Sequence, residues 1–165
     1  MRAAPRARLS ALIHARGVVG VGIVEADEID RLNIHWATMK AMTLAVDALV
    51  AVLGREPGHV LVDGNRLPRW RYPATALVGG DALSLSIAAA SVVAKHRRDA
   101  LMLEHAAAHP HYGWEANKGY AAPAHLAGLR LHGPTPLHRR SFAPVAAAEK
   151  ALAGLSSPFQ GEVAA

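Results

Sequence analysis

The 165-residue sequence contains no cysteine, and only 5% of its residues are aromatic. Without cysteine the chain cannot form disulfides or bind a metal through thiolates, although this absence leaves the redox compartment open. No run approaches the ~18 consecutive apolar residues of a membrane-spanning helix, so we expect no membrane span. Because 52% of the residues are hydrophobic and many of these are alanine, we expect a core of small aliphatic side chains carried on helices.

Acidic residues are also missing from the first 24 positions, where arginines stand among alanines. An organellar transit peptide has this composition. A plain amphipathic helix explains the same residues, because Leu9, Leu12 and Ile13 share one face at the spacing i, i+3 and i+4. We favour the helix and treat this segment as part of the fold.

The formal net charge is +5, and the excess of basic side chains lies between residues 57 and 145. Eight of the ten histidines fall in the same region, so protonation at mildly acid pH would raise its positive charge further. A polyanion such as nucleic acid is the natural partner of such a surface. Basic surfaces are common in other proteins too, so composition alone leaves the partner open.

Length and hydrophobic periodicity predict one α/β domain that is rich in helices. Apolar, β-branched runs bounded by glycine or proline predict three strands, at residues 17–26, 59–64 and 75–80. Apolar side chains at three- and four-residue intervals predict further helices at residues 28–53, 83–108 and 123–131. Gly54 is expected to end the first of these helices, and residues 154–165 are expected to form a frayed tail.

Asp63 ends the apolar stretch "HVLVDG" immediately before a turn. Open α/β sheets bind ligands at the carboxyl ends of their strands, so this carboxylate could belong to a functional site. The alternative is that Asp63 caps its own turn by accepting hydrogen bonds from backbone amides, as aspartate often does. Spacing alone does not decide between the two.

Asp99 is the second acidic candidate. On the long predicted helix, Ser91, Lys95 and Asp99 follow one another at four-residue intervals and share a face. Lys95 could then meet a phosphate and Asp99 a metal ion, whereas the simpler alternative is a Lys95–Asp99 ion pair on the surface. His105 and His109 have the same spacing, but no glutamate follows His105 as a zinc protease requires, so we predict no metal there.

The loop "GWEANKGY" places Trp114 and Tyr120 beside Lys118. Aromatic rings next to a cation are suited to stack on bases or sugars and to pair with phosphate. Tyr120 could equally be a packing residue. The loop is therefore a candidate nucleic-acid contact that needs support from another feature of the chain.

Four segments, taken together and in this order, resemble bacterial ribonuclease HII. They are "EIDRLNIHWATMKAM" (28–42), "VLVDGNRLP" (60–68), "GGDALSLSIAAASVVAKHRRDALM" (79–102) and "HPHYGWEANKGYAAPAHLAGLRLHGPTPLHRRSFAPV" (109–145). The resemblance implies a ribonuclease H-like α/β fold over residues 1–145, with a mixed central sheet flanked by helices and a helical C-terminal part. A short helix and a flexible tail are expected to follow at residues 146–165.

The same resemblance implies a metal-dependent endonuclease that hydrolyses the RNA strand of RNA/DNA hybrids and nicks DNA 5′ of embedded ribonucleotides. It implies Mg²⁺ or Mn²⁺ as cofactor, action as a monomer in the cytoplasm, a part in ribonucleotide excision repair, and no membrane partner. Of the family's four catalytic, metal-binding carboxylates, Asp63 and Asp99 match two. Tyr120 matches a tyrosine that packs against the deoxyribose at the RNA-to-DNA junction. The phosphate- or hybrid-facing positions implied are Lys95, Ser91, His138, Arg139 and Arg140, while Asp81 is interpreted as structural.

The printed sequence departs from this family in one important respect. The family begins with a strand bearing Asp-Glu-Ala-Gly-Arg-Gly, which supplies the other two carboxylates and contacts the 2′-hydroxyl, and no such stretch is present. The next strand of the family has no counterpart either, so the first strands of the sheet are expected to be missing and Met1 to be an internal methionine. The acidic residues of segment 25–30 are not expected to substitute, because this segment faces away from the metals in the family.

Two functions of different classes follow from these observations. The first is a ribonuclease HII whose activity is impaired in this chain, because two carboxylates cannot easily hold two divalent cations. The second is a non-catalytic nucleic-acid-binding remnant of the same fold. An in-frame upstream segment coding for Asp-Glu-Ala-Gly-Arg-Gly would favour the first.

Overall fold

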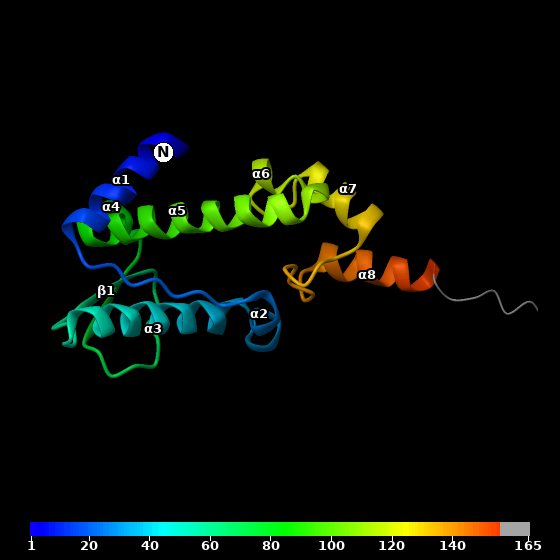
Figure 1. Cartoon of the computed structure of the whole chain (residues 1–165). Helices are drawn as coiled ribbons and strands as arrows, with labels where there is room; N and C mark the ends of the chain where they lie inside the picture. The colour runs from blue at the N-terminus through cyan, green and yellow to red at the C-terminus, as the bar shows by residue number, and fades with distance from the viewer. Residues whose placement is uncertain (156–165) are drawn as a thin grey trace, which may run out of the picture. The chain divides into compact units, whose positions relative to one another are not determined.

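The computed structural model describes residues 1–155 and divides into two compact units, residues 1–101 and the residues from Met102 onward. Elements of the first unit are α1 (Ala3–Arg16), α2 (Ala26–Leu32), α3 (Ile34–Leu53), β1 (Val60–Asp63), β2 (Ala74–Leu77), α4 (Gly80–Leu83) and most of α5 (Leu85–Ala108). Elements of the second unit are the end of α5, η1 (Pro110–Tyr112), α6 (Trp114–Asn117), α7 (Pro123–His132) and α8 (Ala143–Leu155) (Figure 1).

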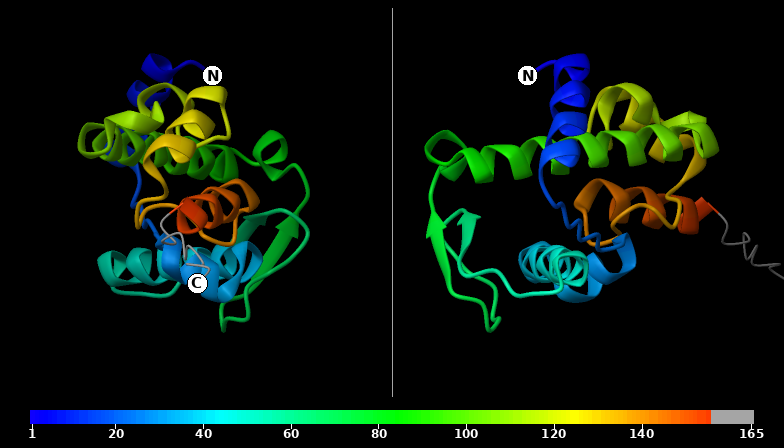
Figure 2. Two further views of the ribbon diagram at one scale, coloured as in Figure 1. Left: turned by 90° about the vertical axis from the view of Figure 1, so that its right-hand side faces the viewer. Right: turned by 60° about the vertical axis from the view of Figure 1, so that its left-hand side comes forward.

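Strands β1 and β2 form a parallel pair, in which Val60 lies opposite Ala74 and Asp63 opposite Leu77 (Figure 2). Two of the three predicted strands are therefore confirmed. Val62 is buried, as its place between two exposed neighbours in β1 requires. The α/β fold is confirmed, but the sheet in the described part of the chain is this two-stranded parallel pair and not the mixed sheet expected.

The strand predicted at residues 17–26 is wrong. This segment is extended but pairs with no strand among the described residues, and it runs along α3 instead (Figure 1). Glycine makes the approach possible, because a Cβ at Gly20 would lie 2.0 Å from the Ala45 carbonyl oxygen and one at Gly22 would lie 2.0 Å from that of Ala41. Its β-branched residues favour extended backbone, whereas a strand also needs a hydrogen-bonding neighbour.

The helix predicted over residues 28–53 is two helices, separated at Asn33. Asn33 has φ +67°, and its side chain accepts hydrogen bonds from the backbone N–H groups of His35 and Trp36, at 3.0 and 3.2 Å. Asparagine is a preferred N-cap because its side-chain oxygen can accept from these amides, so it starts α3. The predicted end of the helix at Gly54 is confirmed: this residue is left-handed and donates to the carbonyl of Val50.

Helix α3 is also long and apolar enough, by length and composition alone, to cross a bilayer, and it is the one helix among the described residues that passes this test. Packed helices of water-soluble proteins pass the same test. The extended segment 17–25 runs along one side of this helix, through the two close glycine contacts.

The remaining predicted helices are confirmed with small shifts at their ends. Residues 3–16 form α1, and α7 begins at Pro123, as predicted. The helix predicted from residue 83 is preceded by one extra turn, α4, and then runs as α5 to Ala108. The predicted tail starts inside α8, which extends to Leu155, and its remaining residues, 156–165, lie outside the described part of the chain.

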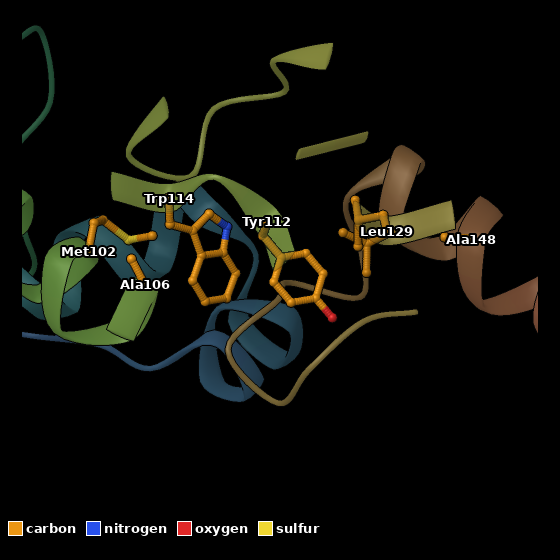
Figure 3. Packing of buried hydrophobic residues seen from close by; sticks show 7 residues of the cluster. Met102, Ala106, Tyr112, Trp114, Leu129 and Ala148 are labelled. Atoms are coloured by element: carbon orange, nitrogen blue, oxygen red, sulfur yellow. The ribbon is translucent and has the colours of Figure 1, made fainter. Parts of the chain in front are cut away.

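The core of the second unit is built around two aromatic rings. Tyr112 and Trp114 are 3% and 2% exposed and stack with ring centroids 5.0 Å apart (Figure 3). Smaller side chains surround them, namely Met102, Ala106, Leu129, Val145 and Ala148. The expectation of an aliphatic core is therefore incomplete, because two of the few aromatic residues form its centre.

Candidate functional site

Asp63 stands at the carboxyl end of β1, where its side chain is exposed. Its Oδ1 accepts a hydrogen bond from the backbone N–H of Gly80, at 2.9 Å, and its Oδ2 has no hydrogen-bond partner among the described residues. The carboxylate thus bonds a backbone amide, as the capping alternative required. The amide nevertheless belongs to the start of α4 and not to the turn that follows Asp63, so the bond joins the ends of two neighbouring strands.

Side chains pack closely around Gly80. A Cβ at position 80 would lie 2.5 Å from Cδ1 of Ile87 and 3.4 Å from Oδ1 of Asp63. A Cβ there would therefore require the Cδ1 methyl of Ile87 to shift. The next residue, Asp81, is exposed in the first turn of α4.

The structure therefore brings two acidic residues, Asp63 and Asp81, to the carboxyl edge of the β1–β2 pair. This is the edge at which open α/β sheets bind their ligands. From the sequence, Asp81 is interpreted as structural. Its position directly after a predicted strand and two glycines, like the position of Asp63 after "HVLV", was the signal that could have identified it.

Asp99 occupies a different environment, inside α5. Arg6 of α1 donates from Nη2 to Asp99 Oδ2 at 2.5 Å, and Lys95 Nζ lies 2.8 Å from Asp99 Oδ1. The Arg6 and Asp99 side chains are each only 14% exposed. The predicted Lys95–Asp99 ion pair is present, and it is one half of a three-residue cluster in which two cations hold one carboxylate.

Asp63 and Asp99 are not neighbours in this structure. Ile87 adjoins Gly80, which bonds Asp63, and Asp99 follows Ile87 by twelve residues on the same helix. At 1.5 Å per residue this is about 18 Å along the helix axis. Two catalytic metal ions about 4 Å apart need ligands from one small region, so the structure does not unite Asp63 and Asp99 in one metal site.

Within residues 1–155 no three His, Asp or Glu side chains gather closely enough to hold a metal ion. The donors at the strand edge are carboxylate oxygens, which suit Mg²⁺ or Mn²⁺. Mg²⁺ is often held by one or two carboxylates and several waters. Asp63 and Asp81 therefore fit the acidic part of a magnesium site, without completing a site for two ions.

The other predicted contacts of the first unit lie on α5. Ser91 is exposed, four residues before Lys95. The side chain of Lys95 is 41% exposed and is already engaged with Asp99. A phosphate could reach Lys95 from solvent, but it would compete there with a carboxylate at 2.8 Å.

Tyr120 belongs to the second unit, where its side chain is 70% exposed. It follows Lys118 and Gly119, which both have positive φ, at +52° and +84°. The ring is therefore presented at the surface by a tight turn, as a sugar- or base-stacking residue would need to be. Trp114, the other ring of this loop, is buried in the core and is not available to a ligand.

The three basic residues 138–140 differ in their surroundings. His138, predicted as a hybrid-facing residue, is 5% exposed, so its ring is buried in this structure. Burial and the nearby His125 lower the pKa of His138 from 6.5 to about 4, and the imidazole is neutral at physiological pH. Arg139 lies over the ring of Phe142 at 5.4 Å, and Arg140 pairs with Glu149 while remaining half exposed.

The arrangement of these elements is shared with a solved structure. The crystal structure of the ribonuclease H2 from Pyrococcus horikoshii OT3 matches with a TM-score of 0.77, covering 93% of this chain and 79% of that chain at 17% identity. At this identity the match shows the fold alone. Together with the acidic strand edge, it defines the class of protein as a ribonuclease H-like α/β protein.

Sequence comparison identifies the family. Residues 3–145 match the family model of Ribonuclease HII. A Ribonuclease HII of Novosphingobium aromaticivorans is 61% identical over 153 residues, 88% of this chain and 78% of that protein. A Ribonuclease HII of Rhizorhabdus wittichii is 57% identical over 141 residues, 86% of this chain and 68% of that protein. The chain belongs to the ribonuclease HII family.

Proposed function

We propose that the chain is a metal-dependent endonuclease that acts in the cytoplasm on the RNA strand of RNA/DNA hybrids and nicks DNA 5′ of embedded ribonucleotides. Membership in the ribonuclease HII family assigns it to the ribonuclease H hydrolases. The observation that carries the proposal is the acidic edge, Asp63 with Asp81, at the carboxyl ends of two parallel strands. Its place in ribonucleotide excision repair would follow from the nicking activity.

Asp63 and Asp81 would hold the divalent ion, Mg²⁺ or Mn²⁺. When bound, such ions supply activation of the attacking water and stabilisation of the leaving oxygen. Because Asp63 Oδ1 accepts the Gly80 N–H, Oδ2 would be the oxygen left to hold the ion. Asp99 would have to give up Arg6 and Lys95 before it could bind an ion, and we therefore assign it a structural role in place of the metal-binding role that the family resemblance implied.

Each unit has its own candidate substrate contacts. Tyr120 would stack on the sugar at the RNA-to-DNA junction, because its ring is exposed and its turn is held by backbone hydrogen bonds. Ser91, Lys95, Arg139 and Arg140 would contact phosphates, and the net charge of +5 would strengthen binding at low salt. Selection of a ribonucleotide requires contact with its 2′-hydroxyl, which is what distinguishes RNA from DNA.

We further propose that the 165-residue chain, by itself, turns over slowly. The described residues contain no cluster of three acidic or histidine side chains, and two carboxylates hold two divalent cations poorly. A second candidate function, binding of hybrids without cleavage, follows from the same observation. The basic charge and the exposed Tyr120 support binding in either case.

Cleavage of a labelled duplex with one embedded ribonucleotide tests the proposal. The purified chain would be incubated with this duplex in Mg²⁺ or Mn²⁺ and compared with its Asp63→Asn and Asp81→Asn variants. We expect the chain to bind the duplex and to nick it slowly, 5′ of the ribonucleotide. Asp63→Asn and Asp81→Asn should abolish this nicking. Full activity of Asp63→Asn, or a chain that does not bind the duplex, would contradict the proposal.

A further inference from the structure

Two buried histidines of the second unit form a hydrogen-bonded pair. His125 and His138 are each 5% exposed, and their Nε2 atoms lie 3.1 Å apart. The other nitrogen of each ring also has a partner. His125 Nδ1 lies 2.9 Å from the carbonyl oxygen of Tyr120, and His138 Nδ1 lies 3.0 Å from the backbone N of Thr135. The metal-binding and phosphate-binding roles proposed above do not involve this pair of histidines.

The partners fix the proton positions on both rings. A backbone N–H can only donate, so His138 Nδ1 is an acceptor and its proton lies on Nε2. A carbonyl can only accept, so the proton of His125 lies on Nδ1. His125 Nε2 is then an acceptor, and it receives both His138 Nε2–H and the indole N–H of Trp114, at 3.2 Å. The two neutral rings are therefore opposite tautomers.

This chain of hydrogen bonds ends on the backbone of Tyr120. The Tyr120 carbonyl accepts from His125 Nδ1 and from the N–H of Ala122, at 2.8 Å, and the Tyr120 N–H donates to the carbonyl of Asn117 at 3.0 Å. The tyrosine ring itself is 70% exposed. The backbone that these bonds hold sets the place from which the exposed ring projects.

We propose that His125 and His138 are positioning residues for Tyr120: the neutral imidazole pair fixes the Tyr120 carbonyl and thereby the direction in which its exposed ring meets the nucleic acid. The inference rests on the proposed function, because it presumes that Tyr120 contacts substrate. The family resemblance implied that His138 faces the hybrid. In this proposal His138 instead acts through His125 and the Tyr120 backbone.

Protonation would break the arrangement. A proton added to His138 Nδ1 would face the Thr135 N–H, and one added to His125 Nε2 would face the Trp114 indole N–H and His138 Nε2–H. Burial, the nearby His125 and the nearby His109 all lower the pKa of His138. No carboxylate is hydrogen-bonded to either ring among the described residues, so no negative charge there compensates an imidazolium.

A matched pair of substitutions at position 125 separates positioning from packing. The amide of asparagine reaches the place of Nδ1 and can still donate to the Tyr120 carbonyl, whereas the amide of glutamine reaches the place of Nε2 and cannot. Binding of a fluorescent duplex with one ribonucleotide, in Ca²⁺ to prevent turnover, would be measured for the wild type, His125→Asn, His125→Gln, Tyr120→Ala and the double variant Tyr120→Ala/His125→Gln.

We expect Tyr120→Ala to weaken binding about tenfold, the scale of one lost stacking contact. His125→Gln should weaken it by up to the same factor, and His125→Asn by less than about threefold. The double variant should bind no more weakly than Tyr120→Ala alone, because His125 acts through Tyr120. Losses that add in the double variant, or equal affinities for the Asn and Gln variants, would overturn the inference.

Two further measurements keep the inference separate from the proposed function. If the wild type does not bind the duplex, the proposed function fails, and amide hydrogen exchange of Ala122 then decides the positioning claim. His125→Gln should speed this exchange about tenfold and His125→Asn should not. If His125→Gln does not fold, ¹⁵N chemical shifts of the wild-type imidazoles decide it: Nδ1–H on His125 and Nε2–H on His138 support the pair, and any other tautomers refute it.

Discussion

Substitution of Arg6 by alanine should destabilise the first unit through the loss of one specific contact. Arg6 donates to Asp99 at 2.5 Å, with both side chains 14% exposed. Removing one partner of a fully buried ion pair costs about 3–5 kcal/mol, whereas a hydrogen bond to a charged group contributes about 1.5–3 kcal/mol. Since Lys95 still pairs with Asp99 in the variant and some solvent reaches the cluster, we expect a loss of about 2 kcal/mol of unfolding free energy.

Urea unfolding at neutral pH measures this loss. Arg8→Ala is the matched control, because Arg8 lies on the same helix but is exposed, and surface changes of this kind shift stability by about 0.5 kcal/mol or less. Lys95→Ala should cost a few tenths of a kcal/mol, about the strength of an i, i+4 pair. The double variant Arg6→Ala/Asp99→Asn should lose less than the sum of the single losses, by about 1 kcal/mol or more.

Two outcomes would refute this reasoning. In the first, Arg6→Ala costs no more than Arg8→Ala. In the second, the Arg6 and Asp99 losses are strictly additive, which would mean that the two side chains do not interact in solution. A change in the dependence of stability on urea, without a change in midpoint, would point to the denatured state and not to this ion pair.

Three further outcomes are expected. Because the pKa of His138 is lowered from 6.5 to about 4, the unfolded chain binds a proton between these pH values that the folded chain does not. The free energy of unfolding should therefore fall as the pH falls from 6.5 towards 4, and urea unfolding across this range would measure the change. This part of the pH dependence should be absent in His138→Leu. Gly22→Ala should destabilise strongly, since its Cβ would lie 2.0 Å from the Ala41 carbonyl oxygen, while Gly58→Ala, with nothing within 4 Å, should be close to neutral in thermal melts. Mn²⁺ binding, followed by electron paramagnetic resonance, should weaken in Asp81→Asn; unchanged binding would remove Asp81 from the proposed site.

Local patterns predicted the elements whose signals are local. The strand ending at Asp63 and the helix beginning at Pro123 are marked by alternation, glycine and a proline at the first helical turn. The helix break at Asn33 also has a local signal, an asparagine before an apolar run. The strand predicted at residues 17–26 is wrong because strand formation depends on a distant partner. The glycines of this segment allow close packing against α3 instead.

The site was less predictable because its decisive contacts are far apart in the sequence. Arg6 and Asp99 are separated by 93 positions, and no spacing rule connects them. The amide that bonds Asp63 lies 17 positions away. His138 stands in a basic run that is typical of a surface, yet its ring is enclosed by aromatic side chains from η1 and α6. Each of these contacts depends on tertiary packing, which local patterning does not encode.

The position of Asp99 makes activity a poor indicator of its role. Helix α5 carries both Asp99, which anchors α1 through Arg6, and Ile87, which packs against Gly80 beside Asp63. A shift of α5 after loss of the anchor would move Ile87 and disturb the Gly80 amide that holds Asp63 Oδ1. Asp99→Asn could therefore lower cleavage without removing a metal ligand. Metal affinity separates the two roles, because a structural Asp99 leaves Mn²⁺ binding at Asp63 close to the wild-type value in the folded variant, and a ligating Asp99 does not.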